Sequence, residues 1–81
     1  MKAHVIVSLK KTVLDPQGKA IHHAIESLGF QSVTHLRQGK CFEIDLEGIE
    51  NEEVARAEIE RIAREVLTNP VIEDFSYEIN K

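Results

Sequence analysis

Residues 2–29 read KAHVIVSLKKTVLDPQGKAIHHAIESLG, and within them the spacing of the apolar residues changes from that of a strand to that of a helix. From residue 2 to residue 9 they recur at every second position, which is the period of a strand with one buried face. These alternating residues are Ala3, Val5, Val7 and Leu9. Ile6 points the other way, so the second face of this strand is partly apolar and needs a cover.

The helix that follows has start and stop signals of its own. Asp15 suits the N-cap, and Pro16 suits the first helical position, where its missing N–H costs nothing. Gly29 suits the left-handed residue that ends a helix. One face carries the apolar residues Ile21, Ala24, Ile25 and Leu28. Gly18 weakens the first turn, so it marks either a close approach by backbone or partner at that point or a glycine that is simply tolerated.

Two further strands are predicted in the middle of the chain. Residues 31–38 are β-prone, but Val33 and Leu36 fall on opposite faces, which indicates a bulged or edge strand. Gly39 and Lys40 read as a turn. Beyond them, Phe42, Ile44 and Leu46 alternate with acidic residues, so we expect a strand that forms a hairpin with residues 31–38.

A second helix and a last strand complete the chain. Asn51 can cap the helix, and Glu52 and Glu53 follow in its first turn, where the helix dipole favours negative charge. Its apolar stripe is Ala55, Ile59, Ile62, Ala63 and Val66. Asn69 and Pro70 end this helix. In the last strand the alternating residues are Phe75, Tyr77 and Ile79.

The predicted order is β-α-β-β-α-β, the ferredoxin-like plan of the α+β class. We therefore expect one domain over residues 1–81, with two helices on one face of a four-stranded antiparallel sheet. A chain this short buries only roughly 60% of its unfolded surface, and such domains commonly gain stability by oligomerising. A homo-oligomer, either a dimer or a tetramer, is the expectation.

The composition indicates the cellular compartment and the kinds of partner to expect. The single cysteine, Cys41, cannot form an internal disulfide, which indicates a reducing compartment and hence the cytoplasm. No apolar run approaches the roughly 20 residues that span a bilayer, so no membrane association is expected. A formal charge of −4 argues against nonspecific nucleic-acid binding.

No catalytic motif stands out, and we expect no catalytic, cofactor or metal site in this chain. Phosphate-loop and dinucleotide signatures are absent from the sequence, and the serines lack a nucleophile-elbow context. His22 and His23 are adjacent on a helix, so their side chains diverge by about 100° and do not share a metal easily. An RNA-recognition domain would need aromatic residues where the first strand carries His4, Ile6 and Ser8.

Three segments in order resemble the PurS family, a subunit of phosphoribosylformylglycinamidine (FGAM) synthase. The first joins Val7-Ser8-Leu9-Lys10 to Val13-Leu14-Asp15-Pro16-Gln17-Gly18, the second is Arg37-Gln38-Gly39-Lys40 with Glu43, and the third runs from Asn69 to Phe75. The resemblance spans nearly the whole chain. It implies a non-catalytic subunit of a glutamine-hydrolysing, ATP-dependent ligase of purine biosynthesis.

The same resemblance implies two partners, a large synthase subunit and a glutaminase subunit, bridged by this chain for ammonia transfer. ATP and Mg are then expected in the large subunit and the cysteine nucleophile in the glutaminase, so Cys41 has no catalytic role. Turn chemistry beyond what folding requires suggests a partner interface at Asp15, Pro16, Gln17, Gly18, Arg37, Gly39, Lys40 and Glu43. The alternative is that Asp15, Pro16 and Gly39 only cap and turn the chain.

Two other functional classes remain as alternatives on the same fold. An ACT-like domain that binds a small metabolite between chains would need a glycine-rich turn after the first strand, and residues 10–14 contain no glycine. An acylphosphatase-like hydrolase would need a phosphate-cradling loop with arginine there, and Lys10-Lys11-Thr12 provides only lysines. The loop after the first strand therefore disfavours both.

Overall fold

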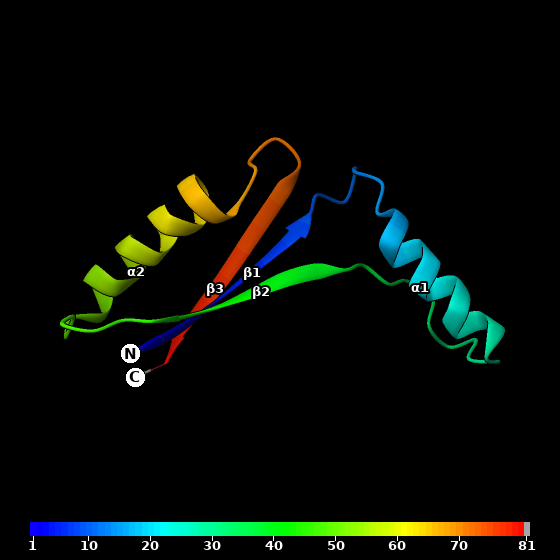
Figure 1. The fold of residues 1–81 in the computed structure, drawn as a ribbon, viewed down its shortest axis with the longest axis horizontal. Coiled ribbons are helices and arrows are strands. Elements are labelled where there is room, and N and C mark those ends of the chain that lie inside the picture. Colours follow the sequence, from blue (N-terminus) through cyan, green and yellow to red (C-terminus); the bar gives the residue numbers. More distant parts are fainter. Residues whose placement is uncertain (81) are drawn as a thin grey trace.

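The computed structural model describes residues 1–80 and has an α+β architecture built on a three-stranded antiparallel sheet (Figure 1). Its elements are β1 (Lys2–Leu9), α1 (Pro16–Ser27), β2 (Gly39–Asp45), α2 (Glu52–Ile62), the π-helical turn η1 (Ala63–Leu67) and β3 (Glu73–Asn80). The strand order is β2-β1-β3. The predicted single domain ends at residue 81, which lies outside the described residues.

The core lies under β1, the central strand. Ala3, Val5 and Val7 are fully buried or nearly so, as the period-2 pattern predicts, and they pack against Ile59 of α2 and Ala63 of η1. Half-buried residues of the outer strands and of the chain near α2 surround them: Phe42, Ile44, Leu46, Leu67, Phe75, Tyr77 and Ile79. The other sheet face is open, and Ile6 on it is 49% exposed.

The second helix forms as its sequence predicts. The Asn51 side chain accepts a hydrogen bond from the Glu53 N–H at 2.8 Å, which caps α2. Two i, i+4 ion pairs, Glu52–Arg56 and Glu60–Arg64, lie on the surface at 3.5 and 2.8 Å. Because all four side chains are exposed, each pair is worth only about 0.3–0.5 kcal/mol. The buried stripe therefore decides where α2 lies.

The first helix projects away from the sheet (Figure 1). Its predicted cap and stop are confirmed, since Asp15 caps α1 and Gly29 has a φ of +95°. Yet α1 contributes no side chain to the core, and Gly18 is its only buried residue. The Cα radius of gyration is 16.0 Å, against about 12 Å for a globular chain of this length. The prediction that both helices cover one face of the sheet is therefore wrong within one chain.

The predicted fourth strand is also absent from the described residues. Residues 31–38 form no strand, and Gly39 and Lys40 begin β2 instead of turning a hairpin. The physical reason is local, because residues 31–38 bond to α1 and its flanking loop. The His22 Nε2 and the Val33 carbonyl are 2.7 Å apart, and the Gln38 N–H donates to Asp15. We call residues 10–38 the arm and the remainder the body.

Between residues 1 and 80, no helix is both long and apolar enough to cross a membrane.

Candidate functional site

Asp15 joins the two ends of the arm. Its Oδ1 accepts a hydrogen bond from the Gly18 N–H at 3.0 Å, and its Oδ2 accepts one from the Gln38 N–H at 2.8 Å. The residue is only 6% exposed. One carboxylate thus caps α1 and fixes the chain where it enters β2. We call this junction, formed by Asp15, Gly18, Arg37, Gln38 and Gly39, the arm root.

Arg37 holds the loop that leads into α1. Its Nη2 donates to the carbonyls of Lys10 at 2.8 Å and Val13 at 2.9 Å, with a longer contact to that of Leu9 at 3.4 Å. Guanidinium hydrogen bonds are stronger than neutral ones. Since these carbonyls lie 24 to 28 residues earlier, Arg37 fixes the arm against the end of β1.

Two glycines of the arm root permit close approach. A Cβ on Gly18 would collide with the Asp15 carboxylate and lie 3.2 Å from the Leu36 carbonyl oxygen. One on Gly39 would lie 2.8 Å from the Val7 carbonyl oxygen, which is backbone and cannot move freely. The close approach that the sequence suggested at Gly18 is therefore confirmed, with the arm's own return segment as the neighbour.

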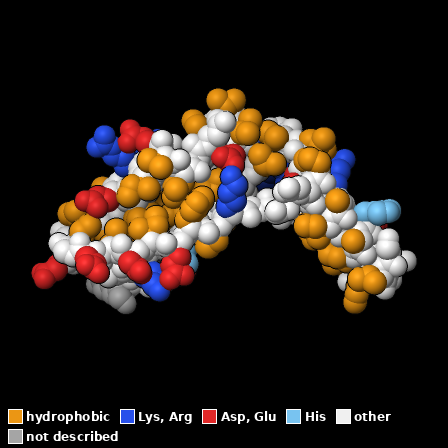
Figure 2. Space-filling view, viewed as in Figure 1, with side chains coloured by type: hydrophobic (Ala, Val, Ile, Leu, Met, Phe, Trp, Pro, Cys, Tyr) orange, Lys and Arg blue, Asp and Glu red, His pale blue; other side chains and the backbone are white. Residues whose placement is uncertain are grey.

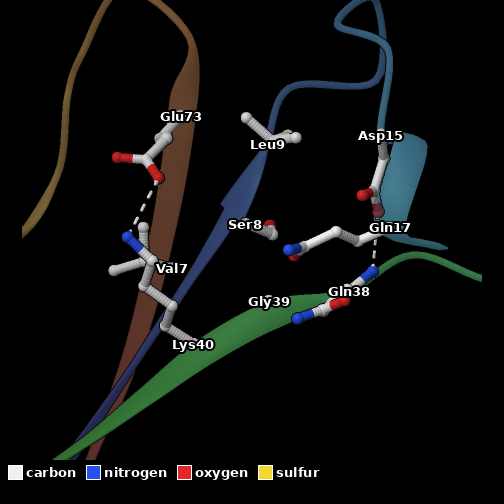
Figure 3. Close-up of a pocket in the computed structure, with 9 residues that line it drawn as sticks. All are labelled: Val7, Ser8, Leu9, Asp15, Gln17, Gln38, Gly39, Lys40 and Glu73. Carbon is white, nitrogen blue, oxygen red and sulfur yellow. Dashed lines mark hydrogen bonds and ion pairs between the residues drawn. The ribbon is translucent and has the colours of Figure 1, made fainter.

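A pocket of about 170 Å³ opens beside the arm root (Figure 3). It is lined by Val7, Ser8, Leu9, Asp15, Gln17, Gln38, Gly39, Lys40 and Glu73. In Figure 3 the Gln17 side chain extends from α1 towards β1. The Lys40 ammonium lies 3.9 Å from a carboxylate oxygen of Glu73. The Glu73 side chain is mostly buried, whereas the Lys40 side chain is exposed. The pocket therefore brings together residues from both ends of the arm and from β3.

The structure thus separates the predicted interface residues into three groups. Asp15, Gly18, Arg37 and Gly39 are engaged inside the chain, and Pro16 occupies the first helical position. Gln17 and Lys40 are exposed at the pocket. Glu43 lies elsewhere, on the open sheet face. Contact of any of the eight with a partner stays a prediction.

Glu43 lies on the open face of the sheet, next to β1. Its carboxylate accepts a hydrogen bond from the Lys2 ammonium at 2.6 Å. This contact lowers the pKa of Glu43 and raises that of Lys2. Both side chains are about half exposed, so the pair adds little stability. It accounts for Glu43 without a partner subunit.

Two contacts of the arm escaped the sequence-based prediction. His22 was weighed as a possible metal ligand, but its ring bonds the Val33 carbonyl. Gln38 was given no role, yet its backbone N–H is the donor to Asp15. Backbone partners leave no signal in residue identity, so neither contact could be found by pattern alone.

The Asp15 carboxyl has a lowered pKa. The hydrogen bond from the Gln38 N–H is the main cause, that from the Gly18 N–H is second, and the Arg37 charge adds a smaller effect. Each favours the ionised form. Because the folded pKa lies below the ordinary value of about 3.9, this stabilisation is present above that value and is lost as the pH falls through the folded pKa.

We therefore expect the arm root to loosen in acid, below about pH 4. The NMR shifts of the Gln38 and Gly18 amides should follow one titration with its midpoint below the ordinary aspartate value. Asp15→Asn should abolish that step. Asp45→Asn, a matched change on the sheet, should leave it in place. A Gln38 amide that titrates normally in Asp15→Asn would contradict this assignment.

Metal and thiol chemistry have few candidates. Within the described residues, no three His, Cys, Asp or Glu side chains are grouped to hold a metal ion. Cys41 is a free, exposed residue of β2.

The fold and the arm root define a class: a small α+β domain whose first helix is held out as a fixed arm. The chain matches the family model PurS, described as phosphoribosylformylglycinamidine (FGAM) synthase, over residues 2–81, and it belongs to this family. The resemblance read from the three sequence segments is thereby confirmed. So is the expectation of a subunit of that synthase, an enzyme of purine biosynthesis.

Named relatives match along nearly their whole length. The FGAM synthase subunit PurS of Methanocaldococcus jannaschii is 42% identical over 80 residues, covering 99% of this chain and 95% of its own. That of Bacillus subtilis is 38% identical, covering 99% and 93%. The crystal structure of the Methanocaldococcus jannaschii subunit superposes with a TM-score of 0.86 at 41% identity, covering 99% and 95%.

A chain from the structure of PurLQS from Thermotoga maritima is also similar. It is 30% identical, with a TM-score of 0.86, and covers 95% of this chain and 93% of its own. That relative was therefore solved within a larger assembly.

Proposed function

We propose that this chain is the non-catalytic subunit that bridges the ATP-dependent synthase subunit and the glutaminase subunit for ammonia transfer. It binds no cofactor itself, and ATP and Mg belong to the large subunit. Family membership and the related chain solved in PurLQS support this role. The single cysteine, with no possible internal disulfide, supports a reducing, cytoplasmic setting for the assembly.

The observation that carries the bridging role is the fixed arm. The chain has only 81 residues, yet it extends 49 Å in its longest dimension and 14 Å in its shortest. A bridge needs two separate surfaces held at a set distance, and the arm root supplies that rigidity through Asp15 and Arg37. Preorganised elements bind with a lower entropic cost than mobile ones.

The arm also supports self-association. Ile21 is 43% and Leu28 76% exposed, and together with Ala24 they form an apolar row along α1. In Figure 2, hydrophobic side chains gather along the lower side of the arm. An amphipathic helix is stabilised mainly by burying such a row against a partner. Within residues 1–80, this row has none.

The body leaves the inner face of β2 only partly covered. Helix α2 packs mainly against β3, and Phe42 and Ile44 on the inner face of β2 stay only half-buried. A second helix over β2 would complete the two-helix cover of the ferredoxin-like plan. We propose that the α1 helix of a second copy fills this place, as in domain swapping, which exchanges an identical element between protomers.

Charge supports the same pairing. The arm holds four Lys or Arg residues and two acidic residues. The rest of the chain holds six Lys or Arg residues and twelve acidic residues. The arm also contains three of the four histidines. A positive arm and a negative body attract each other between copies, and such complementarity fixes partner and orientation.

Beside the arm root, partner contact is carried by two exposed side chains of the pocket, Gln17 and Lys40. The double change Gln17→Ala, Lys40→Ala should weaken capture of the synthase subunit in a pull-down. Lys11→Ala, an exposed change on the arm outside the pocket, is the control. If the double variant keeps its fold and captures both partners as well as the unchanged chain, the pocket beside the arm root is no interface.

A further inference from the structure

A second pocket lies on the arm, between α1 and the return segment 31–38. Its volume is about 160 Å³, and basic and hydroxyl side chains dominate its lining: Lys19, His22, Thr34, His35 and Arg37. The two cations of this lining, Lys19 and Arg37, contrast with a body that carries twice as many acidic residues as Lys and Arg. Neither family membership nor the bridging role assigns this pocket a ligand.

Several hydrogen-bond donors of this pocket are unused. Lys19, Thr34 and His35 have no side-chain hydrogen bond or ion pair to any residue from 1 to 80. Arg37 uses only Nη2 for its carbonyls, which leaves Nη1 and Nε. The His22 ring already donates through Nε2 to the Val33 carbonyl, so it adds no free donor. A site rich in donors and poor in acceptors selects an anion.

Asp15 is the one acidic residue in the lining, and its charge is already satisfied. Both carboxylate oxygens accept backbone N–H bonds, and the Arg37 charge acts on it as well. The carboxylate therefore adds little repulsion, and Arg37 is held in the lining by the carbonyls of Lys10 and Val13. Lys19 and His35 stay free at its exposed rim.

The pocket lies away from the apolar row of α1. At about 100° per residue, Lys19 is about 160° around the helix from Ile21. Burial of the row against a second copy would leave Lys19 accessible. The two surfaces of the arm can therefore be occupied together and tested separately.

We propose that this pocket is a phosphate site, which takes free phosphate or the phosphate of a phosphomonoester. Its volume is well below the roughly 300 Å³ at which pockets for drug-sized ligands begin, so one compact group fills it. A phosphate offers several acceptor oxygens to donors that converge from α1 and from the return segment. Arg with Lys is a pairing well suited to phosphate.

The test uses the His22 and His35 ring resonances of the full chain in NMR, at fixed pH and ionic strength. Sodium phosphate should shift both in a saturable way, and sodium chloride should not. Lys19→Gln should weaken phosphate binding about tenfold, because a hydrogen bond to a charged group is lost. Lys11→Gln, an equal charge change outside the pocket, should leave the affinity unchanged.

Methyl phosphate separates the two sources of the group. Binding of methyl phosphate as tightly as inorganic phosphate supports a phosphomonoester, and binding of inorganic phosphate alone supports the free ion. Absence of a saturable shift with either probe overturns the proposal, and so does an unchanged affinity in Lys19→Gln. None of these readouts depends on the partner subunits, so failure here leaves the bridging role standing.

Discussion

Replacing Ile21 by glutamate should separate the self-associated chain into monomers. Ile21 is the first residue of the apolar row of α1, where the proposed exchange would bury it against Phe42 and Ile44 of a second copy. An unpaired carboxylate buried there costs several kcal/mol, so the dissociation constant should rise on the order of 100-fold or more. Sedimentation velocity over a concentration series measures this directly.

His23→Glu is the matched control, because it places the same acidic group about 200° around α1 from Ile21. It should leave self-association within a few-fold of the unchanged chain. Circular dichroism should show that both variants keep the helix content. A dimer or tetramer that survives Ile21→Glu unchanged would rule out the apolar row as the contact between copies.

The second large effect is on stability. Ile59 is completely buried and is among the largest side chains that anchor α2 to the sheet. Ile59→Ala removes its contacts and leaves a cavity, which typically costs about 2–5 kcal/mol. At about 0.05–0.15 kcal/mol per residue, a chain of 81 residues has a total stability of only about 4–12 kcal/mol. Much of the protein should therefore unfold at low denaturant.

Val54→Ala provides the comparison on the same helix. Val54 is 48% exposed, so its truncation should change the free energy of unfolding by less than about 1 kcal/mol. Urea unfolding followed by circular dichroism gives both values at one protein concentration, which matters because self-association adds to the measured stability. Equal losses in the two variants would show that α2 does not hold the core as described.

Most of the secondary structure could be predicted from short-range patterns. The strands β1 and β3 carry strict alternation, and the caps at Asp15 and Asn51 depend on residues only two or three positions away. The glycine after α1 has the positive φ that its position predicts. Patterns of this kind are complete within a few residues, so the sequence displays them fully.

The errors concern long-range placement. The apolar stripe of α1 correctly indicated a face to be buried, but a stripe does not specify whether the same chain or another one buries it. Gly39 and Lys40 resembled a turn, although Gly39 is needed because β2 passes close to the Val7 carbonyl. The return segment 31–38 lacks strict alternation, and bonds to the arm decided its path.

The candidate site shows the same division. Sequence singled out Asp15, Gly18, Arg37 and Gly39, and these residues do meet at one junction. Their bonding partners are largely backbone groups more than 20 residues away, such as the Gln38 N–H and the Val13 carbonyl. Those partners carry no identity in the sequence, so the cap at Asp15 could be predicted but the bonds of Asp15 to Gln38 and of Arg37 to the Val13 carbonyl could not.

The most direct test of the bridging role is reconstitution of the synthase from its purified subunits. Product formation is measured with glutamine and, separately, with ammonium as the nitrogen source, with and without this chain. If the chain bridges the subunits for ammonia transfer, its omission should remove most of the glutamine-dependent activity and spare far more of the ammonium-dependent activity. Full glutamine-dependent activity from the synthase and glutaminase subunits alone would contradict the role proposed for this chain.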